Sequence, residues 1–186
     1  MKLILGSASP RRKELIQAAG FSFEVRTKDT DESFPASLPC TKVAEFVARK
    51  KLDALLQDAS DDEILLCADT TVVVDELILN KPKDAAEAKA MLGQLSGRSH
   101  NVITGVCIAS KSSISSFSVV TTVYFKKLSA EDIDFYIKEF KPFDKAGAYG
   151  IQEWIGHVAI ECIEGSYNNV VGLPTHEVHQ ALKSLL

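Results

Sequence analysis

The chain has 186 residues, of which 46% are hydrophobic and 25% are charged, and its formal net charge is −4. This composition is typical of a soluble globular protein that can bury a substantial core, so we expect a single domain spanning residues 1–186. The acidic balance argues against a nucleic-acid-binding protein and against a protein that binds anionic membranes, because both need a basic surface.

The hydrophobic pattern predicts helices and strands along the whole chain. Near the N-terminus, Ser9 followed by Pro10 is a pair of residue types that is typical of a helix start. The first half is expected to contain, in order, strand 3–5, a helix from Pro10 that Gly20 ends, strand 21–25, a long polar loop over 26–40, a helix capped by Thr41 that runs to about Leu55, and two strands within 64–79 that reverse near Asp75–Glu76. Long loops in compact domains are often functional.

In the second half, caps and glycines define the expected elements. Asp84 is expected to cap a helix that Gly97 ends, and Ser129 with Asp132 has the pattern of a capping box. The remaining expected elements are strands near 101–109 and 114–126, a helix from 130 to about 140, the Gly-rich loop KAGAYGIQ, a strand near 158–163, the loop GSYNNVVGLP and a final helix. Because helices and strands are mixed without segregation, the sequence predicts an α/β fold with a mixed sheet.

The four cysteines are far apart in the sequence and form no CxxC pair. We therefore expect neither a zinc site nor a disulfide framework, and we interpret the three that lie in apolar runs as small core residues. The apolar run at the N-terminus is too short for a signal peptide, and no stretch approaches a membrane span. These features predict a cytoplasmic protein with no membrane partner.

The segment SASPRRK, residues 7–13, places Arg11, Arg12 and Lys13 in the first turn of a predicted helix. A helix N-terminus already carries partial positive charge and free N–H groups, so acidic residues are usual there. Three cations at this end are unfavourable unless an anion binds to them. The segment therefore predicts a site for a polyanionic small molecule, such as a chain of phosphate groups.

Asp69 interrupts the apolar run CADTTVVV, where a strand is expected to enter the interior. A carboxylate there is costly unless it is paired, hydrogen-bonded or bound to a metal, so Asp69 is a candidate functional residue. The alternative is that Asp69 only caps a turn. The acidic pair Asp31–Glu32 in the long loop is of a kind that is usually solvated, but beside Asp69 it would supply oxygen ligands for Mg²⁺.

Lys51 and Lys81 are two further candidate cations. Lys51 lies late in an amphipathic helix, where a lysine is commonly just solvated, whereas Lys81 stands between an apolar strand and Pro82. Together with the cations of the first helix, they would form a cradle for a polyphosphate. The phosphate-binding patterns GxxxxGK(S/T) and GxGxxG are both absent from the sequence.

Tyr149 and Trp154 flank Gln152 near the Gly-rich loop. An aromatic ring there could stack on a nucleotide base. Packing in the hydrophobic core is an equally good explanation, because large aromatic side chains dominate protein cores.

Several short motifs follow one another along nearly the whole chain: SASPRRKEL, DE at 31–32, AxxK ending at Lys51, ADTTVVV, NKP at 80–82, LSGRSHNVITGV, KAGAYGIQ and EGSYNNVVGLP. Each motif alone is weak, but the ordered set resembles the Maf family of nucleoside triphosphate pyrophosphatases. The resemblance implies a Maf/ITPase-like α/β fold, with a strongly twisted mixed sheet flanked by helices and a deep nucleotide cleft. It also implies a chain that often assembles as a homodimer.

The reaction that the resemblance implies is hydrolysis of a nucleoside triphosphate between its α and β phosphates, with Mg²⁺ or Mn²⁺ as cofactor. Asp69 matches the catalytic base of the family, and Glu32 with Asp69 matches the metal-binding positions. The positions that match phosphate-binding residues are Ser7, Arg11, Arg12, Lys51 and Lys81. Whether Asp69 accepts the proton of the attacking water or mainly holds the metal stays open at this stage.

Base preference is tied by the resemblance to three positions, which here are Arg12, Thr70 and Gln152, the set associated with dTTP and UTP. A physical reason supports this assignment. Uracil and thymine present an acceptor, a donor and an acceptor along their pairing edge, which a glutamine amide can match with one donor and one acceptor. Guanine presents two adjacent donors and would favour a carboxylate instead.

Two functions are compatible with these residues. The first is a dTTP/UTP pyrophosphatase, with modified pyrimidine nucleotides as a further substrate class, that cleanses the nucleotide pool. The second is a nucleotide-binding regulator of cell division or growth in which hydrolysis is slow. The presence of both Asp69 and Glu32 favours the enzyme, because a protein that only binds an anion gains nothing from two carboxylates facing it.

Overall fold

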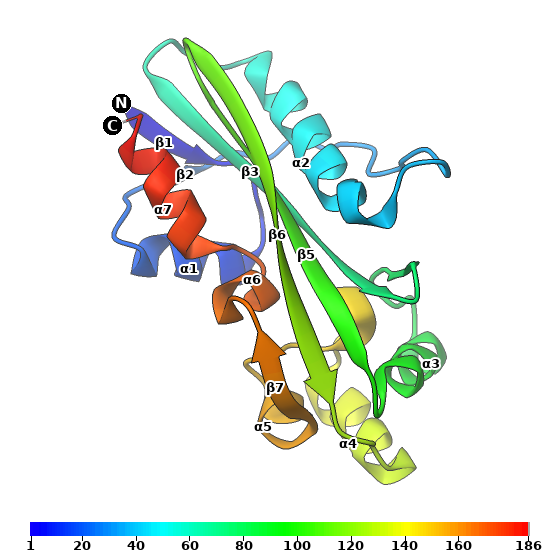
Figure 1. Ribbon diagram of the computed structural model, residues 1–186. Helices are drawn as coiled ribbons and strands as arrows, with labels where there is room; N and C mark the ends of the chain where they lie inside the picture. The colour runs from blue at the N-terminus through cyan, green and yellow to red at the C-terminus, as the bar shows by residue number, and fades with distance from the viewer. Residues whose placement is uncertain (186) are drawn as a thin grey trace. The chain divides into compact units, whose positions relative to one another are not determined.

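The computed structural model of the protein describes residues 1–185. Its strands are β1 (Lys2–Leu5), β2 (Glu24–Val25), β3 (Glu63–Val74), β4 (Leu77–Leu79), β5 (Ser99–Ser110), β6 (Ser113–Phe125) and β7 (Ile160–Glu164) (Figure 1). Its helices are α1 (Pro10–Ala18), α2 (Cys40–Leu56), α3 (Ala85–Leu95), α4 (Ala130–Phe140), α5 (Trp154–Ala159), α6 (Tyr167–Val171) and α7 (Thr175–Lys183), with a 3₁₀ turn, η1, at Ala146–Ala148. In this described part of the chain, no helix has both the length and the apolarity needed to cross a membrane.

The strands form one sheet in the order β2-β1-β3-β5-β6-β7, with β4 paired to β3. Strand β1 pairs in parallel with both β2 and β3, whereas the pairs β3–β4 and β6–β7 are antiparallel. The predicted α/β fold with a mixed sheet is therefore confirmed. Contacts along the chain divide it into two units: the first comprises 1–70, 104–119 and the chain from Gly172 onward, and the second comprises 71–103 and 120–171. The single domain over 1–186 stays a prediction.

In the first unit, helices cover both faces of the sheet, and alternate residues of β1, β3 and β5 point to opposite faces. One face packs against α1 and α7 through Leu3, Leu5, Ile16, Ile64, Leu66, Ala68, Val106, Ile108, Val178 and Leu182. The other face packs against α2 through Ile4, Ala48, Leu52, Leu55, Leu65, Cys67, Cys107 and Ala109. Burial on both faces explains why these strands have continuous apolar runs rather than an alternating pattern.

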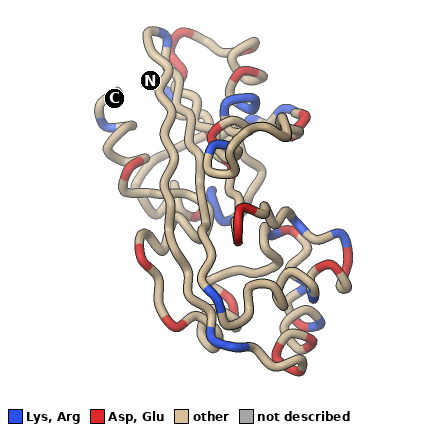
Figure 2. Tube along the Cα trace, turned by 45° about the vertical axis from the view of Figure 1, so that its right-hand side comes forward, with Lys and Arg blue, Asp and Glu red and all other residues tan. Residues whose placement is uncertain are grey.

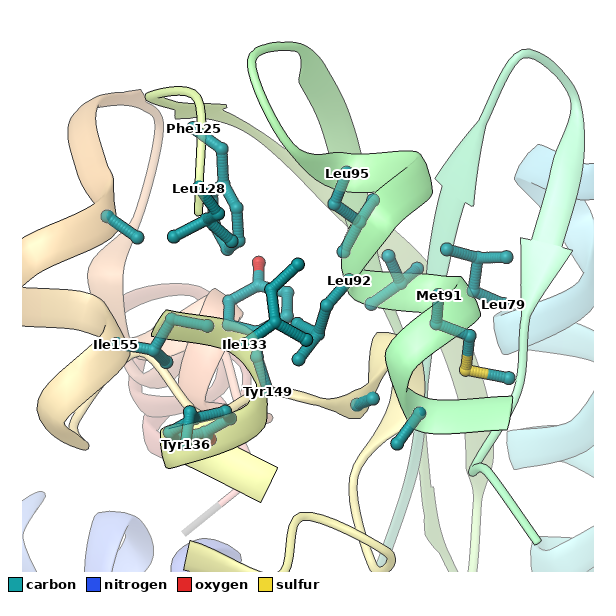
Figure 3. Packing of buried hydrophobic residues seen from close by; sticks show 14 of the residues in the cluster. Leu79, Met91, Leu92, Leu95, Phe125, Leu128, Ile133, Tyr136, Tyr149 and Ile155 are labelled. Carbon is teal, nitrogen blue, oxygen red and sulfur yellow. The ribbon is translucent and has the colours of Figure 1, made fainter. Parts of the chain in front are cut away.

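The core of the second unit lies where α3, α4 and α5 pack against strand residues (Figure 3). Tyr149 belongs to this core, which settles its interpretation in favour of packing. Its hydroxyl lies 2.7 Å from Nε2 of the buried His100, and the ring of Phe125 meets both of these rings edge-on. A histidine therefore lies inside an aromatic cluster that holds the middle of the Gly-rich segment KAGAYGIQ.

His100 should make the stability of the protein sensitive to acid. Burial lowers the pKa of His100 to about 4, below the value of about 6.5 that is usual in an unfolded chain. The unfolded chain therefore takes up the proton first, so stability that is complete above about pH 6.5 is lost as the pH falls toward 4, by up to about 3 kcal/mol.

A His100→Gln variant removes the titrating group and should lose this part of the pH dependence, even if its stability at neutral pH is lower. Urea unfolding at a series of pH values measures the slope. The exposed His157 of the same unit provides a control, since His157→Gln should keep the wild-type slope. The same slope in all three proteins would contradict the prediction.

The start of α2 differs from the expectation. The helix begins at Cys40 with Pro39 at the N-cap position, and Thr41 lies inside the first turn, so the predicted cap was wrong. The ring of Pro39 fixes its φ near the observed −54°. The carbonyl of Pro39 accepts the N–H of Lys42 at 2.8 Å, which closes the first turn earlier than the sequence pattern indicated.

Other short elements also differ. The expected strand over 21–25 is reduced to β2, because Phe21 and Phe23 act as packing side chains against the core beneath α1 and α7. Helix α5 precedes β7, and α6 forms within the loop that was expected at GSYNNVVGLP. Elements of five or six residues have too little periodicity to be recognised in a sequence.

Cysteine burial follows the strand positions. Cys67 and Cys107 are buried in the first unit, and burial raises the pKa of each thiol to about 12. Cys162 is exposed, so its interpretation as a core residue was wrong. It lies in β7, the last strand in the order of the sheet, where an apolar run does not imply burial on both faces.

Candidate functional site

Basic and acidic residues are interspersed along the described trace (Figure 2), so local contacts, rather than a charged face, identify the candidate site. The segment that was predicted to bind an anion connects β1 to α1, with Pro10 as the first helical residue. Ser9 occupies the N-cap position, but its side chain makes no cap hydrogen bond, and its backbone N–H donates to the Ser7 hydroxyl at 3.3 Å. The first turn contains no acidic residue, so no carboxylate within that turn offsets the charges of Arg11 and Arg12 at the positive end of the helix.

Arg12 is held in one orientation by three neutral acceptors. Its Nε donates to the carbonyl of Gly172 at 2.8 Å, Nη1 donates to the hydroxyl of Ser7 at 3.3 Å, and Nη2 donates to the hydroxyl of Thr70 at 3.0 Å. Burial lowers the pKa of the guanidinium, and the charge of Asp69 opposes that effect. A guanidinium carries five N–H donors, so this network leaves donors for a ligand. Arg12 is a preorganised cation rather than a mobile surface side chain.

Lys51 lies between the two carboxylates that the sequence singled out. Its Nζ is 2.7 Å from Oε1 of Glu32 and 2.7 Å from Oδ1 of Asp69. The side chains of Lys51 and Asp69 are only 18% and 17% exposed, whereas that of Glu32 is 52% exposed. Asp69 lies within β3, so its interpretation as a turn cap is wrong, and Lys51 is paired rather than merely solvated.

The acidic pair in the long loop separates into two different roles. Asp31 accepts hydrogen bonds from the backbone N–H and the hydroxyl of Ser33, and these bonds lower the pKa of Asp31 to about 2. Asp31 also pairs with Lys50 at 3.1 Å and is exposed. It therefore stabilises the loop, and Glu32 is the member of the pair that reaches the half-buried Lys51 and, through it, Asp69.

Among the described residues, no group of three or more His, Cys, Asp or Glu side chains is arranged to hold a metal ion. The donor set is instead Glu32 and Asp69, whose carboxylate oxygens both contact one Nζ atom. Two carboxylate oxygens suit a hard cation such as Mg²⁺, which completes its shell with water and substrate phosphates. The residues present therefore fit a divalent cation that binds together with a phosphate ligand.

Lys81 and Gln152 lie in the second unit, and both are exposed. Lys81 follows β4 directly after Asn80, whose carbonyl accepts the N–H of Gly147 at 3.3 Å. Gln152 ends the KAGAYGIQ segment, in which Gly147 lies. This backbone hydrogen bond thus links the residue before Lys81 to the segment that carries Gln152. The roles predicted for Lys81 in phosphate binding and for Gln152 in base selection stay predictions.

Sequence reasoning missed two members of the Arg12 network. Thr104 lies 3.0 Å from Thr70, hydroxyl to hydroxyl, and Gly172 supplies the carbonyl that accepts from Arg12. Gly172 has φ +132°, a conformation that side-chain-bearing residues rarely adopt. The only signal in the sequence was that both residues lie in motifs of the family resemblance, NVITGV and NNVVGLP, which gave no indication of what they contact.

These features define an α/β protein in which a mixed sheet supports a preorganised arginine and a pair of carboxylates linked by a lysine. Comparison with solved structures places the fold. The Staphylococcus aureus Ham1 protein aligns with a TM-score of 0.59 at 13% identity over 100% of both chains. A nucleoside-triphosphatase described as dITP/XTP pyrophosphatase, from Mycobacterium abscessus, aligns with a TM-score of 0.50 at 14% identity, covering 100% of this chain and 99% of that one.

Sequence comparison then identifies the family. A family profile described as Maf-like protein matches residues 2–185. A protein from Porphyromonas gingivalis named dTTP/UTP pyrophosphatase is 48% identical over 185 residues, which cover 98% of this chain and 93% of that protein. A protein of the same name from Parabacteroides distasonis is 46% identical over 183 residues, with coverage of 98% and 95%. The chain belongs to the Maf family.

Proposed function

We propose that the protein is a nucleoside triphosphate pyrophosphatase that hydrolyses dTTP and UTP between the α and β phosphates, releasing the monophosphate and pyrophosphate. The observation that carries the proposal is the arrangement of Glu32, Lys51 and Asp69, in a chain 43–48% identical to proteins named dTTP/UTP pyrophosphatase. A binding protein has no use for two carboxylates beside a phosphate site, whereas anhydride hydrolysis needs a group that orients water and accepts its proton.

In this proposal Asp69 holds the attacking water and accepts its proton at a carboxylate oxygen. Its 17% exposed side chain lies within strand β3, and such a fixed position favours a single productive geometry. Lys51, which contacts Asp69 in the structure at 2.7 Å, holds this carboxylate in one orientation and lies ready to face negative charge on the substrate. Ser7, Arg11, Arg12 and Lys81 bind the phosphate chain, and fixed positive charge there stabilises the leaving pyrophosphate.

The proposed cofactor is Mg²⁺ or Mn²⁺, held by Glu32 and Asp69. When bound, such a cation neutralises charge on phosphate oxygens and lowers the pKa of bound water. Lys51 now provides the positive charge between these two carboxylates, at 2.7 Å from each. Its ammonium can turn to the phosphates once another cation takes that place.

Base selection is assigned to Arg12, Thr70 and Gln152. Arg12 and Thr70 act as one unit, since Nη2 of Arg12 donates to the Thr70 hydroxyl at 3.0 Å. The amide of Gln152 can donate to one carbonyl of uracil or thymine and accept from its ring N–H. Modified pyrimidine nucleotides with the same pairing edge form a further proposed substrate class, and the proposed role is removal of unwanted nucleotides in the cytoplasm, with the homodimer as the proposed assembly.

Product analysis tests the proposal. Purified protein is incubated with Mg²⁺ or Mn²⁺ and, separately, with UTP, dTTP, CTP and GTP. We expect pyrophosphate and monophosphate from UTP and dTTP, at higher rates than from CTP or GTP. Release of orthophosphate would mean attack at the γ phosphate and would overturn the proposal. Metal-dependent binding of UTP without turnover would favour a nucleotide-binding regulator of growth or division.

A further inference from the structure

A buried ion pair closes the segment that carries Gln152. Nζ of Lys145 lies 2.9 Å from Oε1 of Glu153, and the two side chains are only 10% and 19% exposed. Lys145 also contacts Asp144 at 2.8 Å, but the carboxylate of Asp144 is 60% exposed. Burying charges is costly unless their geometry and hydrogen bonds compensate, so the groups that surround this pair matter for its stability.

Tyr136 of α4 completes the arrangement. Its hydroxyl donates to Oε2 of Glu153 and accepts the backbone N–H of Gly150 at 3.0 Å. Both oxygens of the Glu153 carboxylate are therefore engaged, one by an ammonium and the other by a phenol. We call Tyr136, Lys145 and Glu153 the brace.

The brace packs directly over Gly150. A Cβ atom at Gly150 would lie 3.0 Å from Cε of Lys145 and 3.1 Å from Cδ of Glu153. Glycine is thus the residue that lets both side chains approach the backbone closely enough to meet. The ion pair therefore joins Lys145, the first residue of KAGAYGIQ, to Glu153, the residue directly after this segment, and it does so over Gly150.

The segment between these ends is fixed at two more points. The Tyr149 hydroxyl lies 2.7 Å from Nε2 of His100 inside the core, and the N–H of Gly147 donates to the carbonyl of Asn80 at 3.3 Å. Gln152 is exposed and immediately precedes Glu153. Because the backbone on both sides of Gln152 is held, the Cα atom from which its side chain extends has little freedom to move.

We propose that Tyr136, Lys145 and Glu153 are positioning residues that set the location of Gln152 and thereby the choice of base. This inference rests on the proposed function, since it assigns to the brace the control of the residue that meets the base. The brace also keeps the Glu153 carboxylate away from nucleotides. A free carboxylate beside Gln152 would accept from the two adjacent donors of guanine and weaken discrimination against GTP.

Three variants test the inference. Tyr136→Phe removes one hydroxyl, Glu153→Gln removes the charge with the shape kept, and Lys145→Met removes the ammonium. We expect each to raise KM for UTP and dTTP by about tenfold with kcat within about threefold, since the groups assigned to phosphate chemistry are unchanged. The ratio of kcat/KM for UTP to that for GTP should fall, and Lys145→Arg should restore much of it.

Lys89→Met is the matched control, because Lys89 forms an exposed ion pair with Asp134 in the same unit. It should leave KM and the UTP/GTP ratio unchanged, and thermal unfolding monitors the fold of every variant. Brace variants that behave like Lys89→Met, or that lose activity equally on all nucleotides, would overturn the inference. In that case, turnover of UTP by the wild-type protein would still support the proposed function. Failure of the wild-type protein to hydrolyse or bind UTP would reject both.

Discussion

An Asp69→Asn variant should lose at least about a hundredfold in kcat on UTP and dTTP, the lower end of the range for removal of a general base. Asparagine has the same shape as aspartate and still offers an oxygen to Lys51, but it cannot take up the proton of an attacking water. The substitution also leaves Lys51 with one charged partner, Glu32, instead of two. Steady-state kinetics at saturating nucleotide and metal measures the loss.

Asp31→Asn is the control for this experiment. Asp31 is also an acid of the site region, but it is exposed and bound to Ser33 and Lys50. Its substitution should change kcat by less than about threefold, as expected for a surface change away from the reacting atoms. An Asp69→Asn enzyme that keeps activity within about threefold of wild type would contradict the assigned role, provided that circular dichroism shows an unchanged fold.

A Gly105→Ala variant should lose about 3 kcal/mol or more of unfolding free energy, or fail to fold. A Cβ at Gly105 would lie 2.2 Å from the backbone N of Glu45 and 2.4 Å from the carbonyl carbon of Ala44. Strand β5 and helix α2 therefore touch backbone to backbone at this point. Neither can shift without disturbing the buried residues on both sides of the contact, and overpacking of that kind is strongly destabilising.

Gly93→Ala is the same chemical change as Gly105→Ala, but we expect it to raise the unfolding free energy rather than lower it. Gly93 lies inside α3, and nothing lies within 4 Å of the Cβ that it would gain. Alanine should stabilise the helix there by about 0.5–1 kcal/mol, since glycine is a poor helix former. Urea unfolding of both variants measures the two effects. A loss below about 1 kcal/mol for Gly105→Ala would show that the close approach relaxes easily.

Local patterns were sufficient to predict much of the fold. The capping box of Ser129 and Asp132 and the cap at Asp84 are present as expected, because a cap depends only on residues within one turn. Asp69 was recognisable because one charge in an apolar strand needs a partner. The partner itself was only a candidate, since Lys51 comes from a helix 18 residues earlier in the sequence.

Contacts between distant segments were beyond the reach of the sequence. Arg12 and Gly172 are 160 residues apart, and nothing near either residue indicates that a guanidinium will meet that carbonyl. The pair of Lys145 and Glu153 was missed for another reason. Lysine and glutamate are residue types that usually lie at the surface. Only the packing of these two side chains over Gly150 shows that they are largely buried. Burial of a charged side chain is a property of the tertiary structure, which local pattern does not encode.

The order of the sheet also affects how the protein behaves at high concentration. The terminal strands of that order are β2 and β7, of two and five residues. Glu24 in β2 pairs with Lys2 at 2.8 Å, and Glu161 and Glu164 in β7 are exposed. Short edges lined with acidic side chains repel the edges of other sheets. The long, apolar strand β5 lies between β3 and β6 inside the sheet, where another molecule cannot pair with it.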